Sequence, residues 1–331
     1  MQDHIMDRRN AQPLISVVAP FYNEELVIDQ FFRQVIAVLE ATGSEWEIVC
    51  VDDGSRDRTL DQLLAAARAN PPIKVLQLSR NFGKEAALTA GLEASGGDVV
   101  VLIDADLQDP PTLISQMLEK WREGFDVVYG VRQSRDQDSL AKRVTARGFY
   151  RVFNQLTPTP LPANAGDFRL MDRRVVDRVR QLPERTRFMK GLFAWVGFRS
   201  TAVAYDRPGR QAGQSGWSYW KLWNFALDGL TSFSTMPLRV WTYVGLTVSL
   251  LAFLYASFLV LRTLVAGVDL PGYASLMVVM LFLGGIQLIS LGVIGEYLGR
   301  VFIEVKQRPV YLVDRVYQFP AGQSESRDGP A

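Results

Sequence analysis

Acidic side chains follow one apolar run of this chain in an alternating pattern. Residues 99–103 are apolar, and Asp104, Asp106 and Gln108 come next at every second position. If the chain stays extended, these side chains point to one side, because side chains alternate between the faces of a strand. Two carboxylates held that close repel each other unless a cation lies between them. Such oxygen ligands suit Mg²⁺ or Mn²⁺ completed by water and phosphate oxygens. The alternative for an Asp-x-Asp pair is a solvated strand end or a helix cap.

Polar residues also follow three other apolar runs. They are PFYNEE at 20–25, DDGS at 52–55 and SRNFGK at 79–84. One carboxylate of Asp52 and Asp53 is expected to form an Asx turn before the next helix. The other is then left to accept hydrogen bonds from a nucleotide base or ribose.

Short apolar runs alternate with amphipathic stretches over the first part of the chain. The predicted strands are 15–19, 48–51, 73–78, 99–103 and 127–129, and helical patterns cover 27–39 and 60–69. Fully apolar strands separated by helices indicate a largely parallel sheet covered on both faces. Ligands of such sheets bind at the carboxyl ends of the strands, so the polar residues described above are expected to form one site.

Two stretches of 22 residues, 240–261 and 274–295, contain no charged residue and are long enough to cross a membrane as helices. Two core helices of a soluble domain are the alternative. Arg239 precedes the pair, and basic residues follow it at Arg300, Lys306 and Arg308. By the positive-inside rule, both outer ends and the N-terminal domain face the cytoplasm, which predicts a two-span protein of the cytoplasmic membrane.

Composition excludes several kinds of chemistry. The chain of 331 residues has a formal net charge of +1, which gives no argument for nucleic acid as a partner. Cys50 lies in an apolar run and His4 in the polar start of the chain, so histidine-based acid–base chemistry and zinc are not expected. Gly83-Lys84 lacks the upstream glycine and following hydroxyl residue of an ATPase P-loop, and no dinucleotide-binding glycine motif is present.

The motifs together resemble one family. The runs VVAPFYNEE, VDDGSRDRT, SRNFGKEAALTAGL, DADLQDPP, GDFRLMDR and GEYLGRVFIEVKQRPVY are similar to those of polyprenyl-phosphate glycosyltransferases of family 2, relatives of dolichyl-phosphate mannose synthase and of GtrB-type glucosyltransferases. The resemblance extends from Leu14 to Tyr311. It implies a GT-A fold and transfer of a hexose, with inversion, from a nucleotide diphosphate to a polyprenyl phosphate. UDP-glucose and undecaprenyl phosphate are the first expected donor and acceptor.

The resemblance also implies roles for particular residues. The nucleotide sugar is assigned to Pro20, Tyr22, Glu24, Asp52, Lys84, Asp104 and Ala105, and the divalent ion, Mg²⁺ or Mn²⁺, to Asp104, Asp106 and Gln108. The catalytic assignment is Asp167, Asp106 and Arg132, with Asp167 either a base or acceptor-orienting group or part of a structural ion pair with Arg169 or a neighbour. The acceptor phosphate is assigned to Arg132, Arg147, Arg207 and Arg210, because an arginine fork can bond two phosphate oxygens.

One loop departs from the family pattern. Gly216 stands where the family often carries a lysine, so either Arg207, Arg210 or Lys221 replaces it or the phosphate site is weaker here. The aromatic residues that follow predict an interfacial helix. They are Trp217, Tyr219, Trp220, Trp223 and Phe225.

The expected organisation has five parts. They are a mobile tail (1–13), a cytoplasmic GT-A domain (14–212), interfacial helices (213–236), a transmembrane hairpin (237–299) and a cytoplasmic C-terminal segment (300–331). Glycines at 284, 285 and 292 leave close packing against another copy open. A processive polysaccharide synthase and a non-catalytic membrane accessory protein are the competing interpretations. The first lacks its Gln-x-x-Arg-Trp motif and further spans, and the second is disfavoured by the intact acidic set.

Overall fold

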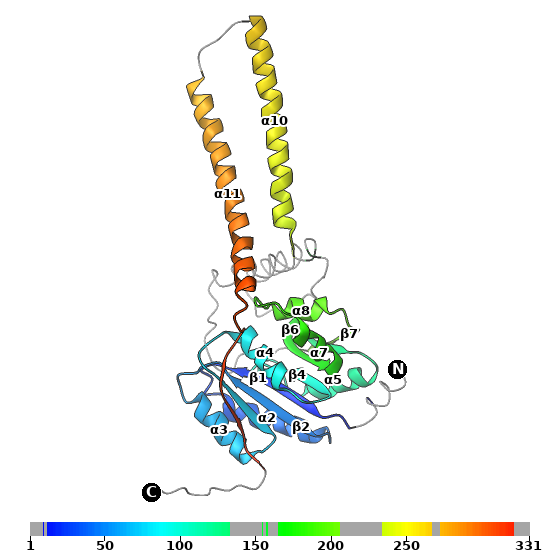
Figure 1. Ribbon diagram of the computed structural model, residues 1–331. Coiled ribbons are helices and arrows are strands. Elements are labelled where there is room, and N and C mark those ends of the chain that lie inside the picture. Colours follow the sequence, from blue (N-terminus) through cyan, green and yellow to red (C-terminus); the bar gives the residue numbers. More distant parts are fainter. Residues whose placement is uncertain are drawn as a thin grey trace, which may run out of the picture.

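The computed structural model describes residue 9, residues 12–132, residues 154 and 157, and residues 165–205, 234–266 and 272–320. Within this part of the chain, eight strands form one sheet in the order β7-β5-β6-β4-β1-β2-β3-β8 (Figure 1). The strands are β1 (Ile15–Phe21), β2 (Trp46–Asp52), β3 (Ile73–Leu78), β4 (Val99–Leu102), β5 (Val127–Arg132), β6 (Ala165–Asp172), β7 (Ser200–Tyr205) and β8 (Val313–Gln318). The strands β6 and β8 run antiparallel to their neighbours, and the other pairs are parallel.

Helices cover both faces of the sheet. They are α2 (Ile28–Ala41), α3 (Thr59–Ala69), α4 (Lys84–Ala94), α5 (Leu113–Arg122), α7 (Arg173–Gln181) and α8 (Met189–Trp195). One core lies between the sheet and α2, α3 and α5, and the other between the sheet and α4, α7 and α8. Val17 and Val18 of β1 belong to different cores, as period-two alternation requires. The predicted α/β fold with a mostly parallel sheet is confirmed.

Because β6 is antiparallel to β4, its first residues lie at the same edge of the sheet as the carboxyl ends of the parallel strands. Leu102 at the end of β4 pairs with Arg169, and Val99 at its start pairs with Asp172. The residues before Arg169 therefore lie at the carboxyl edge of the parallel strands. Asp167 reaches that edge from a strand that runs in the opposite direction.

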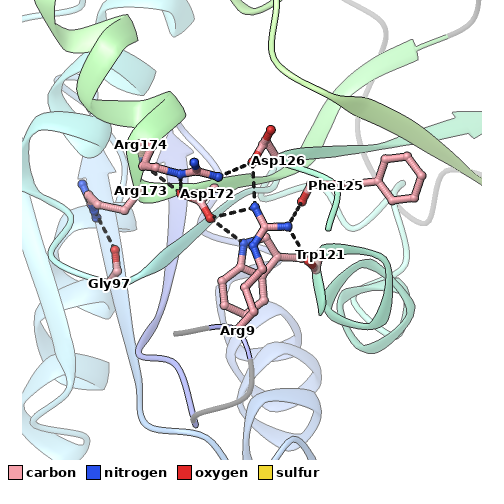
Figure 2. Close-up of polar contacts among 8 residues, drawn as sticks. All are labelled: Arg9, Gly97, Trp121, Phe125, Asp126, Asp172, Arg173 and Arg174. Carbon is pink, nitrogen blue, oxygen red and sulfur yellow. Dashed lines mark hydrogen bonds and ion pairs between the residues drawn. The ribbon is translucent and has the colours of Figure 1, made fainter. Parts of the chain in front are cut away.

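A buried ionic cluster around Arg9 lies at the other end of the strands, opposite the carboxyl edge (Figure 2). The Arg9 guanidinium, only 3% exposed, lies 2.6 Å from Asp126 and 3.3 Å from Asp172, and it donates to the carbonyl oxygen of Trp121 at 2.8 Å. Arg174 also pairs with Asp126, at 2.6 Å. The predicted mobile tail is therefore anchored at residue 9, because a buried arginine held by two carboxylates is costly to release.

Two long helices extend away from the sheet domain, side by side (Figure 1). They are α10 (Met236–Ala266) and α11 (Tyr273–Lys306), and they contain both predicted apolar stretches. Two segments, Leu238–Phe258 and Val278–Lys306, are long and apolar enough to cross a membrane, and neither is buried inside the protein. The helix α11 continues past the predicted end of the hairpin at 299 and includes the charged turns up to Lys306.

The chain returns to the sheet after α11. The strand β8 pairs antiparallel with β3, from Lys74 opposite Gln318 to Leu78 opposite Val313. Tyr311 donates a hydrogen bond to Glu93 of α4 at 2.6 Å. The segment after 300, predicted as a separate part, thus completes the sheet that begins at residue 15.

Candidate functional site

The loops that follow β2 and β3 are joined at the carboxyl edge of the sheet. Asp53 accepts hydrogen bonds from the backbone N–H groups of Phe82 (2.7 Å) and Gly83 (2.9 Å), directly before α4. Gly54 has a φ of +69°, and a Cβ there would lie 2.5 Å from the backbone of Arg80. This close approach requires glycine, and it fixes where α4 begins.

Lys84, the first residue of α4, connects two carboxylates. Its ammonium nitrogen lies 2.7 and 2.8 Å from the two oxygens of Asp104 and 2.6 Å from Asp167. Burial alone would lower the pKa of Lys84, but these two carboxylates raise it above its ordinary value. Lys84 is therefore charged at neutral pH and holds the loop after β4 against the start of β6.

Asp167 has a second basic partner. Lys190 of α8 lies 3.7 Å from its other oxygen. Burial would raise the pKa of Asp167, but Lys84 and Lys190 outweigh it and hold that pKa well below the usual range. Arg169 donates instead to the carbonyl oxygens of Gly166 (2.9 Å) and Asp167 (3.3 Å). The ion pair that the sequence left open is thus made with the two lysines.

Glu85 lies beside this group and is poorly solvated. It accepts a hydrogen bond from the Met189 N–H at 3.0 Å. Burial, and then the charge of Asp167, raise the pKa of Glu85 to about 7. The site therefore combines a carboxylate that stays ionised, Asp167, with one that titrates near neutral pH.

The predicted alternation of Asp104, Asp106 and Gln108 along an extended strand is wrong. The strand β4 ends at Leu102, and Leu107 adopts a positive φ of 52°. Asp106 turns back and accepts a hydrogen bond from the Gln108 N–H at 3.2 Å. A local Asx-type turn satisfies the backbone here, so the three side chains do not share a face through strand geometry.

Arg132, at the end of β5, belongs to a cluster on the far side of the same edge. Its guanidinium lies 3.9 Å from Asp109 and donates to the hydroxyl of Tyr205 at 3.4 Å. Tyr205 in turn donates a hydrogen bond to Asp109. Burial, together with Asp109, raises the pKa of Tyr205 to about 12, so the hydroxyl remains protonated.

Four of the residues assigned to the nucleotide lie at the ends of β1 and β2 or directly after β1. Asn23, at a positive φ of 54°, accepts a hydrogen bond from the Arg56 N–H at 2.8 Å, which ties the two loops together. Tyr22 is 42% exposed, whereas Asp52 is buried and accepts from the Ser55 N–H at 3.3 Å. Asp52, which the resemblance assigned to the nucleotide, therefore forms the predicted turn. Asp53, the carboxylate that this turn would leave for the nucleotide, holds the start of α4 instead.

The remaining three assigned residues lie in β1 or in the loops that follow β1 and β4. Pro20 and Glu24 are half-buried, and the Glu24 N–H donates to Thr59 at 2.8 Å. Ala105 is buried beside Asp104.

A divalent ion such as Mg²⁺ requires several oxygen ligands around one point. In the ranges that the structure describes, no group of three or more His, Cys, Asp or Glu side chains is arranged around one point. Asp104 and Asp106 nevertheless offer two carboxylates on one turn, and Mg²⁺ is commonly held by one or two carboxylates plus substrate phosphates. Lys84 already supplies a cation beside Asp104. The residues fit an ion that binds together with a diphosphate.

Several assigned residues lie outside the described ranges. They are Arg147, Arg207 and Arg210, together with the loop around Gly216 and the aromatic segment from Trp217 to Phe225. In the described part, the sequence analysis had assigned no role to Glu85, Lys190 or Tyr205. The sequence offered one indication for Glu85, because it directly follows Lys84 at the end of the polar run at 79–84.

Comparison with known proteins gives matches along nearly the whole chain. The model described as "Glycosyl transferase family 2" matches residues 16–180, and the model described as "GtrB C-terminal hairpin" matches residues 236–301. An uncharacterized glycosyltransferase of Synechocystis sp. is 58% identical over 92% of this chain and 95% of that protein. The SfII prophage-derived bactoprenol glucosyl transferase of Shigella flexneri is 48% identical over 92% of this chain and 98% of that protein. Among solved structures, mannosyl-3-phosphoglycerate synthase from Rubrobacter xylanophilus is 19% identical, with a TM-score of 0.48 over 68% of this chain and 74% of that one.

Proposed function

Because the chain belongs to glycosyltransferase family 2 and carries the C-terminal hairpin of GtrB, we propose that it transfers glucose from UDP-glucose to the phosphate of a polyprenyl lipid. The observation that carries the proposal is the 48% identity to a bactoprenol glucosyl transferase over 98% of that protein's length. Undecaprenyl phosphate is the proposed acceptor.

The proposed reaction needs no proton acceptor. A phosphate monoester has a second pKa near 6, so the acceptor oxygen is already ionised at neutral pH. This oxygen forms a bond to the anomeric carbon of the sugar while the bond from that carbon to the UDP oxygen breaks, which inverts the configuration. A divalent ion, when bound, would stabilise the charge of the departing diphosphate.

The charges of the site suit this chemistry. Asp167 keeps its negative charge because of Lys84 and Lys190, so it is a poor base. We assign it the role of orienting the two lysines, which would in turn orient the acceptor phosphate, rather than removing a proton. Lys84 and Arg132 are paired with Asp104, Asp167 and Asp109, so positive charge for the phosphate groups of donor and acceptor would come from these cations together with a bound divalent ion.

We also propose that α10 and α11 span the cytoplasmic membrane as a hairpin, with the sheet domain on the cytoplasmic side. Both helices are apolar over at least the length of a bilayer core and are not covered by the rest of the protein. Arg239 and Lys306 lie at the two ends that join the sheet domain. This arrangement holds the carboxyl edge of the sheet near the surface from which a polyprenyl phosphate presents its headgroup.

The test is sugar transfer by the purified full chain in detergent. Undecaprenyl phosphate is incubated with labelled UDP-glucose, UDP-galactose, UDP-N-acetylglucosamine or GDP-mannose, with Mg²⁺ or Mn²⁺ and with EDTA. We expect label in the lipid fraction from UDP-glucose only, and loss of transfer with EDTA and in Asp106→Ala. Asp61→Ala, an exposed carboxylate of α3, is the matched control and should behave as wild type. If no donor labels the lipid while UDP still binds, the proposal is wrong.

A further inference from the structure

The loop between α7 and α8 is held by a carboxylate from the far end of the chain. Glu304, in the last turn of α11, accepts hydrogen bonds from the N–H groups of Arg185 (2.9 and 3.1 Å) and Thr186 (3.1 Å). Neighbours of Glu304 on α11 are exposed, with Ile303 at 49% and Val305 at 73%. Glu304 itself is half-buried, so its contact with the loop is specific to this position.

The same loop leads directly into the site. Arg187 donates to the carbonyl oxygens of Leu182 (2.8 Å) and Glu184 (3.2 Å), which makes the loop compact. At its end, Met189 donates to Glu85, and the next residue, Lys190, pairs with Asp167. The segment from 185 to 190 is thus held by Glu304 on one side and by Glu85 on the other.

The element that carries Glu304 is continuous with the apolar hairpin. The helix α11 runs from Tyr273 to Lys306 without a break. The Tyr297 hydroxyl donates to the Ser234 carbonyl oxygen at 2.5 Å, which joins α11 to the start of α10. A displacement of the hairpin relative to the sheet domain would therefore be transmitted to the loop through Glu304.

We propose that Glu304 is a positioning residue, which holds the 185–190 segment so that Lys190 is presented to Asp167. The inference rests on the proposed function, because it assumes that the site around Asp167 performs the transfer. An ionised carboxylate that accepts backbone N–H bonds forms some of the stronger hydrogen bonds in proteins. It also ties a loop that has little regular structure of its own to the end of a long helix. Removing Glu304 frees two backbone donors and leaves the segment before Lys190 held only on the Glu85 side, by the hydrogen bond from Met189 and by the short helix α8.

The contact itself is tested by hydrogen–deuterium exchange on the full chain in detergent. In wild type, the amides of Arg185 and Thr186 should exchange slowly, and Glu304→Ala should accelerate their exchange by about tenfold or more. Glu296→Ala is the matched control, because Glu296 lies on the same helix and pairs with Arg300 at 3.3 Å. Unchanged exchange in Glu304→Ala would refute the contact, and this measurement does not depend on activity.

The positioning role is tested by transfer kinetics. Glu304→Ala should lower kcat by about tenfold with a change of less than about threefold in KM for UDP-glucose, since donor-binding loops are untouched. Glu304→Gln, which keeps an acceptor oxygen, should recover part of the rate, and Glu296→Ala should match wild type.

A double mutant shows whether Glu304 acts through Lys190. Lys190→Met combined with Glu304→Ala should be no slower than Lys190→Met alone, because both changes remove the same interaction. A double mutant whose kcat falls by the product of the two single-mutant losses would refute the inference. A normal kcat in Glu304→Ala would refute it as well. A wild-type protein that transfers no sugar would refute the proposed function instead.

Discussion

Lys84 pairs with two carboxylates at once, and its removal should lower both the stability of the protein and the rate of sugar transfer. Its nitrogen lies 2.7 Å from Asp104 and 2.6 Å from Asp167, so the two nearest carboxylate oxygens are at most about 5.3 Å apart. At an effective dielectric constant of about 20, two unit charges at that distance repel by about 3 kcal/mol. The Lys84 side chain is 39% exposed, and solvent screening reduces the expected loss in Lys84→Met to about 1–2 kcal/mol.

Thermal unfolding of the detergent-solubilised chain measures this loss. Lys84→Met should lower Tm by roughly 3–6 °C. The loss should be smaller when Mn²⁺ is present, because a bound cation would offset the repulsion between Asp104 and Asp167. Transfer should fall by roughly 100-fold, the scale seen when a preorganised charge is removed from a reacting centre.

Lys120→Met is the control for Lys84→Met. Lys120 has almost the same exposure, 41%, and pairs with Glu123 on the surface of α5, far from the site. Its loss should change Tm by no more than about 1–2 °C and leave transfer unchanged. If Lys84→Met unfolds and transfers like Lys120→Met, the bridge between the two carboxylates has no energetic role and the reasoning fails.

Two further predictions concern stability. Because burial and Asp167 raise the pKa of Glu85 from its ordinary 4.5 to about 7, the stability contributed by its protonated form is present below pH 4.5 and lost as pH rises through 7. Glu85→Gln should therefore raise Tm at pH 8 but not at pH 4.5, and an equal shift at both pH values would contradict the assignment. Arg9→Ala leaves Asp126 and Asp172 without their buried partner and should cost about 3 kcal/mol in thermal unfolding. Arg33→Ala, an exposed change on α2, is its control, and equal Tm values for the two variants would show that the N-terminal anchor is dispensable.

The elements with local signals were predicted closely. The strand at 73–78 matches β3, and the helical patterns at 27–39 and 60–69 match α2 and α3 to within two residues. The two helices pack with a regular period against one core, and β3 is buried between both cores, so their spacing is visible in the sequence. The strands β6, β7 and β8 were not predicted, because each mixes polar and apolar residues and none is a fully apolar run.

The site was predicted in part. Parallel topology places the loops after β1 to β4 at one edge, and that follows from the apolar runs alone. The pairing of Lys84 with Asp167, 83 positions later, depends on β6 entering the sheet in reverse, and no local pattern indicates that. The alternation after residue 103 failed for a local reason, since the backbone turns at Asp106 and Leu107 once the strand has ended.

The position of β8 has a consequence for how the protein is made. The strand β3 is synthesised long before its partner, and the whole hairpin lies between them in the chain. During translation the nascent domain therefore has an open sheet edge at β3, of the kind that favours association with other unpaired strands. The edge closes only after the apolar helices have left the ribosome. With the membrane arrangement proposed above, the last folding step of the sheet domain would follow delivery of the hairpin to the bilayer. Biogenesis in this order would let a chain complete its fold only where its lipid substrate is found.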